Sequence, residues 1–110
     1  MTFSLERLGA TTVVSVGGQL TLNNRGELRE RVLARLADGE TDFVIDFADA
    51  DYIDSSGLGV LVSLSKHIRD GHGRLKLAGL NDDLARLFAL TKLDSLFDIA
   101  ETRAAALGET

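Results

Sequence analysis

A nearly continuous apolar run, DFVIDF at residues 42–47, constrains the fold more than any other stretch of this chain. Such a run is typical of a central strand that is covered on both faces. The spacing of apolar residues predicts a helix before it at 27–37 and a second helix after it at 55–70. Strand and helix therefore alternate here, which indicates an α/β fold.

The flanking segments extend this alternation. Residues 3–8 and 12–17 read as strands and are separated by a turn at 9–11, which predicts an antiparallel hairpin. The later elements are expected to be a strand at 74–79, a third helix after Asn81, a short strand at 96–100 and a short helix in ETRAAALG at 101–108. The predicted fold is a mixed β-sheet, with an opening hairpin followed by alternating strands and helices that pack against it.

Capping residues and apolar faces define the predicted helices. Asn23 or Asn24 is a candidate N-cap for the first helix, and Asp38 with Gly39 ends it. In the second helix the apolar positions cover a wide arc, which predicts that it is well buried. These positions are Leu58, Leu61, Val62, Leu64 and Ile68.

Composition excludes several classes of protein. The length of 110 residues predicts one domain over 1–110. The absence of cysteine excludes disulfides and thiolate metal sites. A net charge of -5 argues against binding to nucleic acid or anionic membranes. The start MTFSLERLGA lacks the features of a signal peptide, and no apolar run approaches the roughly 20 residues of a membrane span. We expect a cytoplasmic protein.

The segment DADYIDSSGLGVLV, residues 49–62, carries the candidate site. A catalytic Ser55 would need a base within hydrogen-bond reach. His67 lies twelve residues further along the same predicted helix, about 18 Å away, and His72 lies in the turn beyond it. The G-x-S-x-G motif is also absent. These features disfavour serine hydrolysis, and we expect no enzymatic activity.

Phosphate-binding and metal-binding sites are disfavoured as well. Gly57 and Gly59 match part of a dinucleotide-binding loop, but Val62 stands where the third glycine belongs. A receiver-type site with Mg²⁺ would need an acidic pair, and the first strand offers only Glu6. Upstream carboxylates would also repel a nucleotide phosphate: Asp46, Asp49, Asp51 and Asp54. We expect neither a cofactor nor a metal.

A helix cap accounts for part of the segment. Asp54 or Ser55 is placed to accept a hydrogen bond from the free N–H groups of the helix. A cap leaves the glycines unexplained, because Gly57 and Gly59 each cost about 1 kcal/mol relative to alanine inside a helix. Small residues at these positions suggest that something comes close to the first turn.

The segment YIDSSGLGVLVSL, after the apolar strand, resembles the signature of the STAS domain, specifically of bacterial anti-sigma factor antagonists. That signature is Asp-Ser-(Ser/Thr)-Gly-(aliphatic)-Gly, matched here by residues 54–59. The resemblance covers nearly the whole chain, including VVSVGGQL, RLKLAGLNDDLARLFALTKLDSLFDI and ETRAAAL. One departure concerns the loop expected near the serines. The family commonly has Gly-Glu-Leu-Asp where this chain has Gly18, Gln19, Leu20 and Thr21.

The resemblance implies a phosphorylation switch. Ser55 is the implied phosphorylation site, and Ser56 is the alternative. The implied partner is an anti-sigma factor with serine kinase activity of the GHKL type, which the unphosphorylated chain binds so that the sigma factor is released. Phosphorylation ends this binding and a phosphatase restores it. The implied partner-binding residues are Thr21, Asn23, Asp54, Ser55, Ser56, Gly57, Leu58 and Gly59. The chain itself is expected to be a monomer or a weak dimer.

Two alternatives stay open. The first is a STAS module of another system, such as a lipid-transport complex subunit or a sensor component without sigma-factor control. A small nucleotide-binding or hydrolytic domain is the alternative from a different class. Outside the signature, Arg29, Arg31 and Arg35 are interpreted as a solvated helix face, with partner contact as the alternative.

Overall fold

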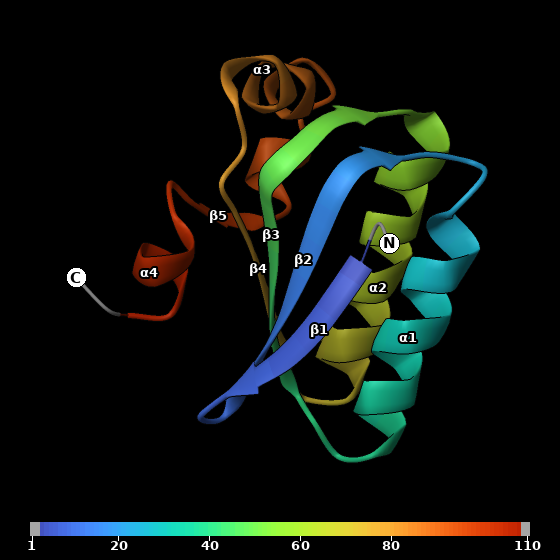
Figure 1. Ribbon diagram of the computed structural model, residues 1–110, viewed down its shortest axis with the longest axis vertical. Coiled ribbons are helices and arrows are strands. Elements are labelled where there is room, and N and C mark those ends of the chain that lie inside the picture. Colours follow the sequence, from blue (N-terminus) through green and yellow to red (C-terminus); the bar gives the residue numbers. More distant parts are fainter. Residues whose placement is uncertain (1–2, 109–110) are drawn as a thin grey trace.

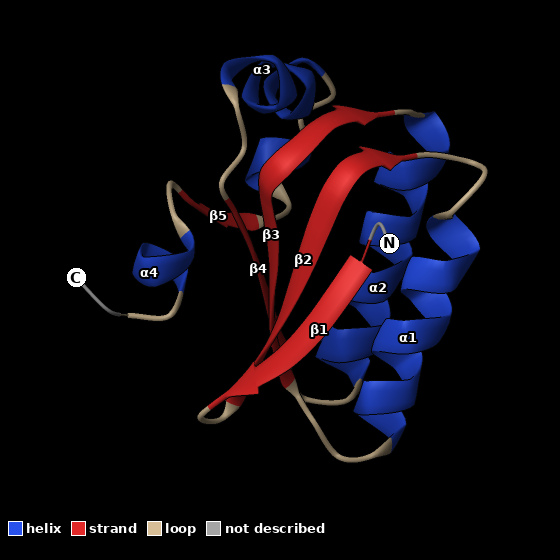
Figure 2. Cartoon of the chain, viewed as in Figure 1, coloured by secondary structure: helices blue, strands red, loops and turns tan. Residues whose placement is uncertain are grey.

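The strand predicted at 42–47 forms the middle of the sheet in the computed structural model, which describes residues 3–108 (Figures 1 and 2). Within that range five strands lie in the order β1-β2-β3-β4-β5. The first two are antiparallel, and each later strand is parallel to its neighbour. The bounds are Phe3–Leu8 for β1, Thr11–Leu20 for β2, Asp42–Ile53 for β3, Arg74–Ala78 for β4 and Asp98–Ala100 for β5. This confirms the predicted mixed α/β fold. The four terminal residues of the predicted domain lie outside the described residues.

Helices α1 (Arg25–Ala37) and α2 (Ser55–Asp70) lie side by side on one face of the sheet (Figure 1). Successive strands advance in one direction across the sheet, so right-handed crossovers place both helices on the same side. Phe43, Ile45 and Phe47 of β3 belong to the main core, which includes the buried residues of both helices. The short helix α4 (Arg103–Ala106) covers the other face.

The second face of the sheet has a small apolar cluster of its own. Val13, Val44 and Ala78 pack with Ala106 of α4. The central strand is therefore covered on both faces, as its apolar run predicts. The helix predicted over 101–108 is confined to four residues and begins after Thr102, whose hydroxyl accepts from the Ala105 N–H at 3.1 Å.

Helix α3 (Asp82–Leu90) begins as the sequence predicts. The Asn81 Oδ1 accepts a hydrogen bond from the Leu84 N–H at 2.8 Å. Leu84 and Phe88 join the main core, and the Phe88 ring packs edge-to-face against Phe97 with centroids 5.9 Å apart. A 3₁₀ turn, η1 (Leu93–Ser95), precedes β5 and was not predicted.

Two strands are longer than predicted. The strand expected at 12–17 continues to Leu20, and the one expected at 42–47 continues to Ile53. The added halves pair with each other across two register shifts, so that Gly17 lies opposite Asp49 and Leu20 opposite Ile53. Acidic residues are poor strand formers, but here the outward positions carry them while Ala50 and Ile53 turn inward. The ends of β2 and β3 are therefore extended because they pair with each other, and not because of their local sequence.

Val62 corrects the predicted face of α2. Its side chain is 37% exposed, whereas Leu58, Leu61, Leu64 and Ile68 are buried. Position 62 lies seven residues after Ser55, so the two share the outer face of the helix.

Candidate functional site

Helix α2 begins at the serine pair, immediately after β3. Asp54 is the N-cap, with an extended backbone, and its Oδ1 accepts a hydrogen bond from the Gly57 N–H at 2.8 Å. Of the two capping candidates, Asp54 is therefore the cap. Ser55 is the first helical residue and is exposed, while Ser56 is half-buried.

The same carboxylate holds the loop between β2 and α1 against the start of α2. The Asp54 Oδ2 accepts from the Leu22 N–H at 3.1 Å, and the Asp54 N–H donates to the Leu20 carbonyl at 3.2 Å. The Gly57 N–H is the main cause that lowers the pKa of Asp54 below its ordinary value. The N–H groups of Leu22 and Ser56 and the Arg25 guanidinium also lower it, against the opposing effect of desolvation. Asp54 therefore remains a carboxylate at neutral pH.

The loop at 21–24 contains Thr21 and Asn23, the other implied partner-binding residues, and it contacts the start of α2 through Leu22. Thr21 is half-buried and Asn23 is exposed, and Leu22 between them donates to the Asp54 cap of α2. Asn24, one of the two predicted candidates, occupies the N-cap position of α1, but its side chain forms no capping hydrogen bond. Its side chain closes the loop instead, because Oδ1 accepts from the Thr21 N–H at 2.8 Å and Nδ2 donates to the Gln19 carbonyl at 2.7 Å.

The two glycines of the signature have different surroundings. Gly57 is buried, and a Cβ there would overlap the Leu20 carbonyl oxygen and lie 2.8 Å from Ile53 Cγ2. The close approach that the sequence suggests is thus made at Gly57 by the chain itself. Gly59 is exposed, and a Cβ there would meet nothing within 4 Å. The packing of the fold does not require a glycine at 59.

Two exposed apolar side chains flank the site, and sequence reasoning missed both. Leu22 is 61% exposed in the loop, and Tyr52 is 50% exposed near the end of β3, opposite Gln19. Exposed apolar residues that form a contiguous patch are typical of interaction surfaces, and these two residues are candidates for one. Burial along the second half of β3 does not alternate, since Asp51 and Tyr52 are both exposed, so strand periodicity could not have indicated Tyr52.

Charge around Ser55 is lower than the sequence suggests. Asp49 and Asp51 are exposed, but Asp46 is buried and accepts from Arg103 Nε at 3.0 Å. Arg103 belongs to α4, on the opposite face of the sheet. Asp46 is therefore neutralised and its partner lies on the face of the sheet opposite α2, contrary to expectation.

Neither histidine is arranged as a base for Ser55. His67 Nδ1 lies 2.9 Å from the carbonyl oxygen of Ser63 on its own helix, and His72 adopts a positive φ of 64° in the following turn. Within residues 3–108, no group of three His, Cys, Asp or Glu side chains is arranged to hold a metal ion. No helix in that range is long and apolar enough to cross a membrane.

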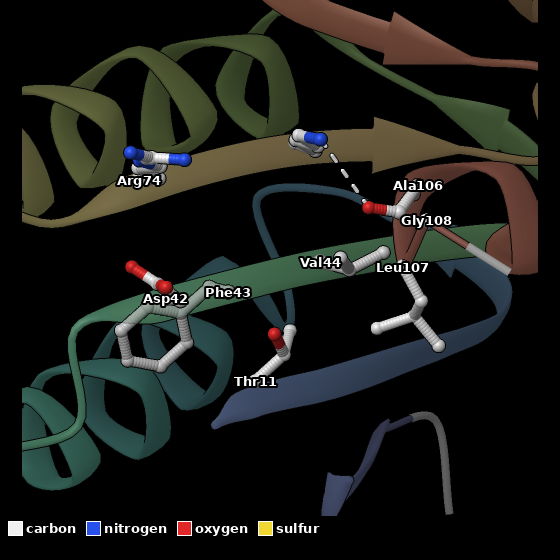
Figure 3. A pocket seen from close by; sticks show the side chains of 9 residues that line it. Thr11, Asp42, Phe43, Val44, Arg74, Ala106, Leu107 and Gly108 are labelled. Atoms are coloured by element: carbon white, nitrogen blue, oxygen red, sulfur yellow. Dashed lines mark hydrogen bonds between the residues drawn. The ribbon is translucent and has the colours of Figure 1, made fainter. Parts of the chain in front are cut away.

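A separate hollow lies beside α4, on the sheet face away from α1 and α2 (Figure 3). Its volume is about 200 Å³. Val44 and Leu107 form part of its wall, and Lys76 Nζ donates to the Ala106 carbonyl at 3.4 Å. The α2 N-terminus contributes nothing to it. This hollow is therefore unrelated to the serine pair.

Comparison with known proteins places this geometry in a family. Residues 2–106 match the STAS domain family. The anti-sigma-B factor antagonist of Bacillus subtilis (strain 168) is 38% identical over 87 residues, which are 79% of each chain. The anti-sigma-B factor antagonist of Staphylococcus aureus (strain NCTC 8325 / PS 47) is 33% identical over 88 residues, 80% of this chain and 82% of the relative.

Solved structures agree in fold. An anti-sigma factor antagonist from Mycobacterium paratuberculosis has a TM-score of 0.87 at 26% identity, covering 97% of this chain and 91% of that one. The Bacillus cell fate determinant SpoIIAA in its phosphorylated form has a TM-score of 0.76 at 22% identity, covering 96% of each chain. The chain therefore belongs to the STAS domain family, among relatives that are anti-sigma factor antagonists.

Proposed function

We propose that this chain is an anti-sigma factor antagonist whose binding is switched off by phosphorylation of Ser55. In its unphosphorylated form it binds an anti-sigma factor, and the sigma factor is released. The observation that carries this proposal is the position of Ser55, exposed on the first turn of α2 beside the fixed Asp54 cap. Two relatives of the chain are named anti-sigma-B factor antagonists, which supports the antagonist part of this proposal.

Exposure favours Ser55 over Ser56 as the acceptor. A kinase must reach the hydroxyl from outside, and Ser55 is exposed while Ser56 is half-buried. Ser55 also lies on the outer face of α2 with Gly59 and Val62, both exposed. A phosphate on Ser55 would therefore project into the surface that a partner contacts.

The electrostatics of the α2 N-terminus suit a local switch. A phosphate adds a charge of about -1.5 to -2. The free N–H groups at a helix N-terminus favour an anion, so the helix need not unfold. The added charge stands beside Asp54 and changes the surface directly. SpoIIAA, which shares this fold, exists in a phosphorylated form, so the fold accepts the modification.

The chemistry of phosphate transfer belongs to the partner. We infer that the anti-sigma factor is a GHKL-type serine kinase that supplies ATP and Mg²⁺, and that a separate phosphatase resets the switch. This chain is then substrate and ligand, not enzyme. It acts in the cytoplasm as a monomer or weak dimer through Thr21, Asn23, Asp54, Ser55, Ser56 and Gly59. Gly57 and Leu58, which the resemblance also implied, are buried and are not available to a partner.

Affinity purification with the intact chain as bait tests this function. We expect a GHKL-type kinase in the eluate and, after incubation with that kinase and ATP, phosphate on Ser55 by mass spectrometry. Phosphate on Ser56 alone would move the site by one residue. A membrane transporter in place of the kinase, with no phosphate accepted, would favour a STAS module of a lipid-transport system.

A further inference from the structure

A hollow of about 350 Å³ lies between the first turn of α1 and the second turn of α2. Three residues of α1 and three of α2 line it: Arg25, Gly26, Arg29, Gly59, Val60 and Ser63. Ser55, Gly59 and Ser63 are spaced four residues apart, so they share one side of α2. The hollow therefore continues the surface that carries the proposed phosphorylation site.

The two arginines of this hollow have no anionic partner within residues 3–108. The other arginines of α1 are engaged, since Arg31 lies 3.6 Å from the Glu27 carboxylate and Arg35 3.1 Å from that of Glu40. Neither Arg25 nor Arg29 forms an ion pair or a side-chain hydrogen bond in the described part of the chain. Arg25 acts only at longer range, as a minor cause of the lowered pKa of Asp54. Of the four arginines of α1, Arg31 and Arg35 form ion pairs, and Arg25 and Arg29 form none within the described residues.

The stability of the two helices does not account for the residues that line the hollow. Two cations four residues apart on a helix repel each other, and a helix N-terminus disfavours positive charge. Gly59 weakens the interior of α2 although a Cβ there would meet nothing within 4 Å. A Cβ at Gly26 would likewise meet nothing. The hollow is kept open by residues that do not improve the stability of the helices.

We propose that this hollow receives an acidic side chain of the anti-sigma factor, with Arg25 and Arg29 holding its carboxylate. The proposal rests on the proposed function and adds the chemistry of the partner. Charge complementarity supports this occupant: a chain of net charge -5 presents two unpaired guanidinium groups beside the site. Guanidinium groups bind carboxylates through paired hydrogen bonds, and such contacts select and orient a partner.

Calorimetric titration of the full chain with the anti-sigma factor kinase tests the proposal, in a Ser55→Ala background so that no phosphate is added. Arg29→Glu and Arg25→Glu should each weaken binding by about tenfold or more. The matched control is Arg69→Glu, which makes the same charge change at an exposed position near the far end of α2. It should change the affinity less than about twofold.

Two further variants sharpen the result. Gly59→Leu should also weaken binding, because the side chain enters the hollow, and circular dichroism checks that it folds. An acidic-to-arginine substitution in the kinase that restores binding to Arg29→Glu would identify the carboxylate. Binding by both arginine variants within twofold of Arg69→Glu would overturn the inference while leaving the proposed function intact.

The remaining outcomes are distinct. If the unsubstituted chain does not bind the kinase, the proposed function fails and this docking partner fails with it. A second outcome concerns chains that keep Ser55. The arginine variants could bind the kinase normally while Ser55 is unmodified, yet bind it better than the unsubstituted chain once Ser55 is phosphorylated. In that case Arg25 and Arg29 bind the chain's own phosphate. That result would overturn the proposal that a carboxylate of the partner occupies the hollow.

Discussion

Gly57 and Gly59 stand two positions apart in α2, yet a methyl group added at each meets different surroundings. At Gly57 it would meet the Leu20 carbonyl and the Ile53 side chain. We expect Gly57→Ala to lower the free energy of unfolding by about 2 kcal/mol through overpacking. Gly59→Ala should raise it by up to about 1 kcal/mol, because alanine favours the helix and the space is open.

Urea unfolding of the two single variants measures this difference. Each variant controls for the other, because both make the same substitution in the same helix. If both variants changed the free energy of unfolding equally and in the same direction, helix propensity alone would determine the effect. The contact between α2 and the end of β2 would then be looser than described.

At the residue scale, the sequence predicted the start of α2 but not the atoms that surround it. The segment at 54–59 predicted the helix start and left Asp54 and Ser55 as candidates for its cap. It could not distinguish the two glycines, because the atoms that exclude a side chain at Gly57 come from Leu20, far away in the sequence. It also placed Asp46 at the site, although Arg103 pairs with it on the other face.

The N-cap of α2 links this helix to the loop at 21–24, and its charge makes the link depend on pH. The folded-state pKa of Asp54 is lowered, chiefly by the Gly57 N–H. Its carboxylate therefore stabilises the fold above the unfolded-state pKa of about 3.9, and this contribution is lost as pH falls through the folded-state pKa. Asp54→Asn should be less stable than the unsubstituted chain near pH 7, and the gap should shrink below about pH 4.

Chemical unfolding between pH 7 and pH 3 measures that gap. Glu40, whose pKa is lowered chiefly by the Thr12 hydroxyl, is present in both proteins and cancels in the difference. Asp70→Asn at the far end of α2 is the matched control, since Asp70 is exposed. A gap that stays constant across this pH range would contradict the assigned role of the Asp54 charge.

In addition to the apolar contacts of Ala106, Arg103 attaches helix α4 to the sheet through three polar contacts. This side chain donates to Asp46 at 3.0 Å, to Ser15 Oγ at 2.7 Å and to Glu6 at 3.3 Å. Arg103→Ala leaves Asp46 buried without its cation, and we expect a loss of about 2–3 kcal/mol in the free energy of unfolding. Arg86→Ala is the control, because its ion pair with Asp83 is exposed and should contribute less than about 1 kcal/mol.

Urea unfolding compares these variants, and adding Asp46→Ala to Arg103→Ala completes the test. The double variant should recover part of the loss, because the buried unpaired charge is gone. A loss in Arg103→Ala no larger than that of Arg86→Ala would show that α4 is held by its apolar contacts alone.

Whole elements were predictable where local periodicity decides and not where distant pairing does. The helices, the hairpin and the strand at 42–47 follow from apolar spacing. The second half of β3 does not, because its acidic sequence is extended only through pairing with 17–20. Asn23 or Asn24 was expected to cap α1. Asn24 takes the N-cap position, but its side chain bonds to the loop backbone, which depends on the same tertiary arrangement.

For the whole molecule, the position of Ser55 predicts a switch that leaves the fold unchanged. The phosphate adds to an existing helix N-terminus rather than entering the core. In amide NMR spectra, we expect phosphorylation to shift resonances of the first turn of α2 and of residues 21–24. Resonances of α4 and β5 should stay in place. Shifts spread over the sheet would indicate a global rearrangement instead.

The affinity of the chain for the anti-sigma factor kinase, before and after phosphate is placed on Ser55, tests the central claim most directly. We expect tight binding by the unmodified chain and by Ser55→Ala. Binding should be at least about tenfold weaker for the phosphorylated chain and intermediate for Ser55→Asp, which adds fewer charges and acceptor oxygens. Equal affinity of the unmodified and phosphorylated chains would contradict the switch.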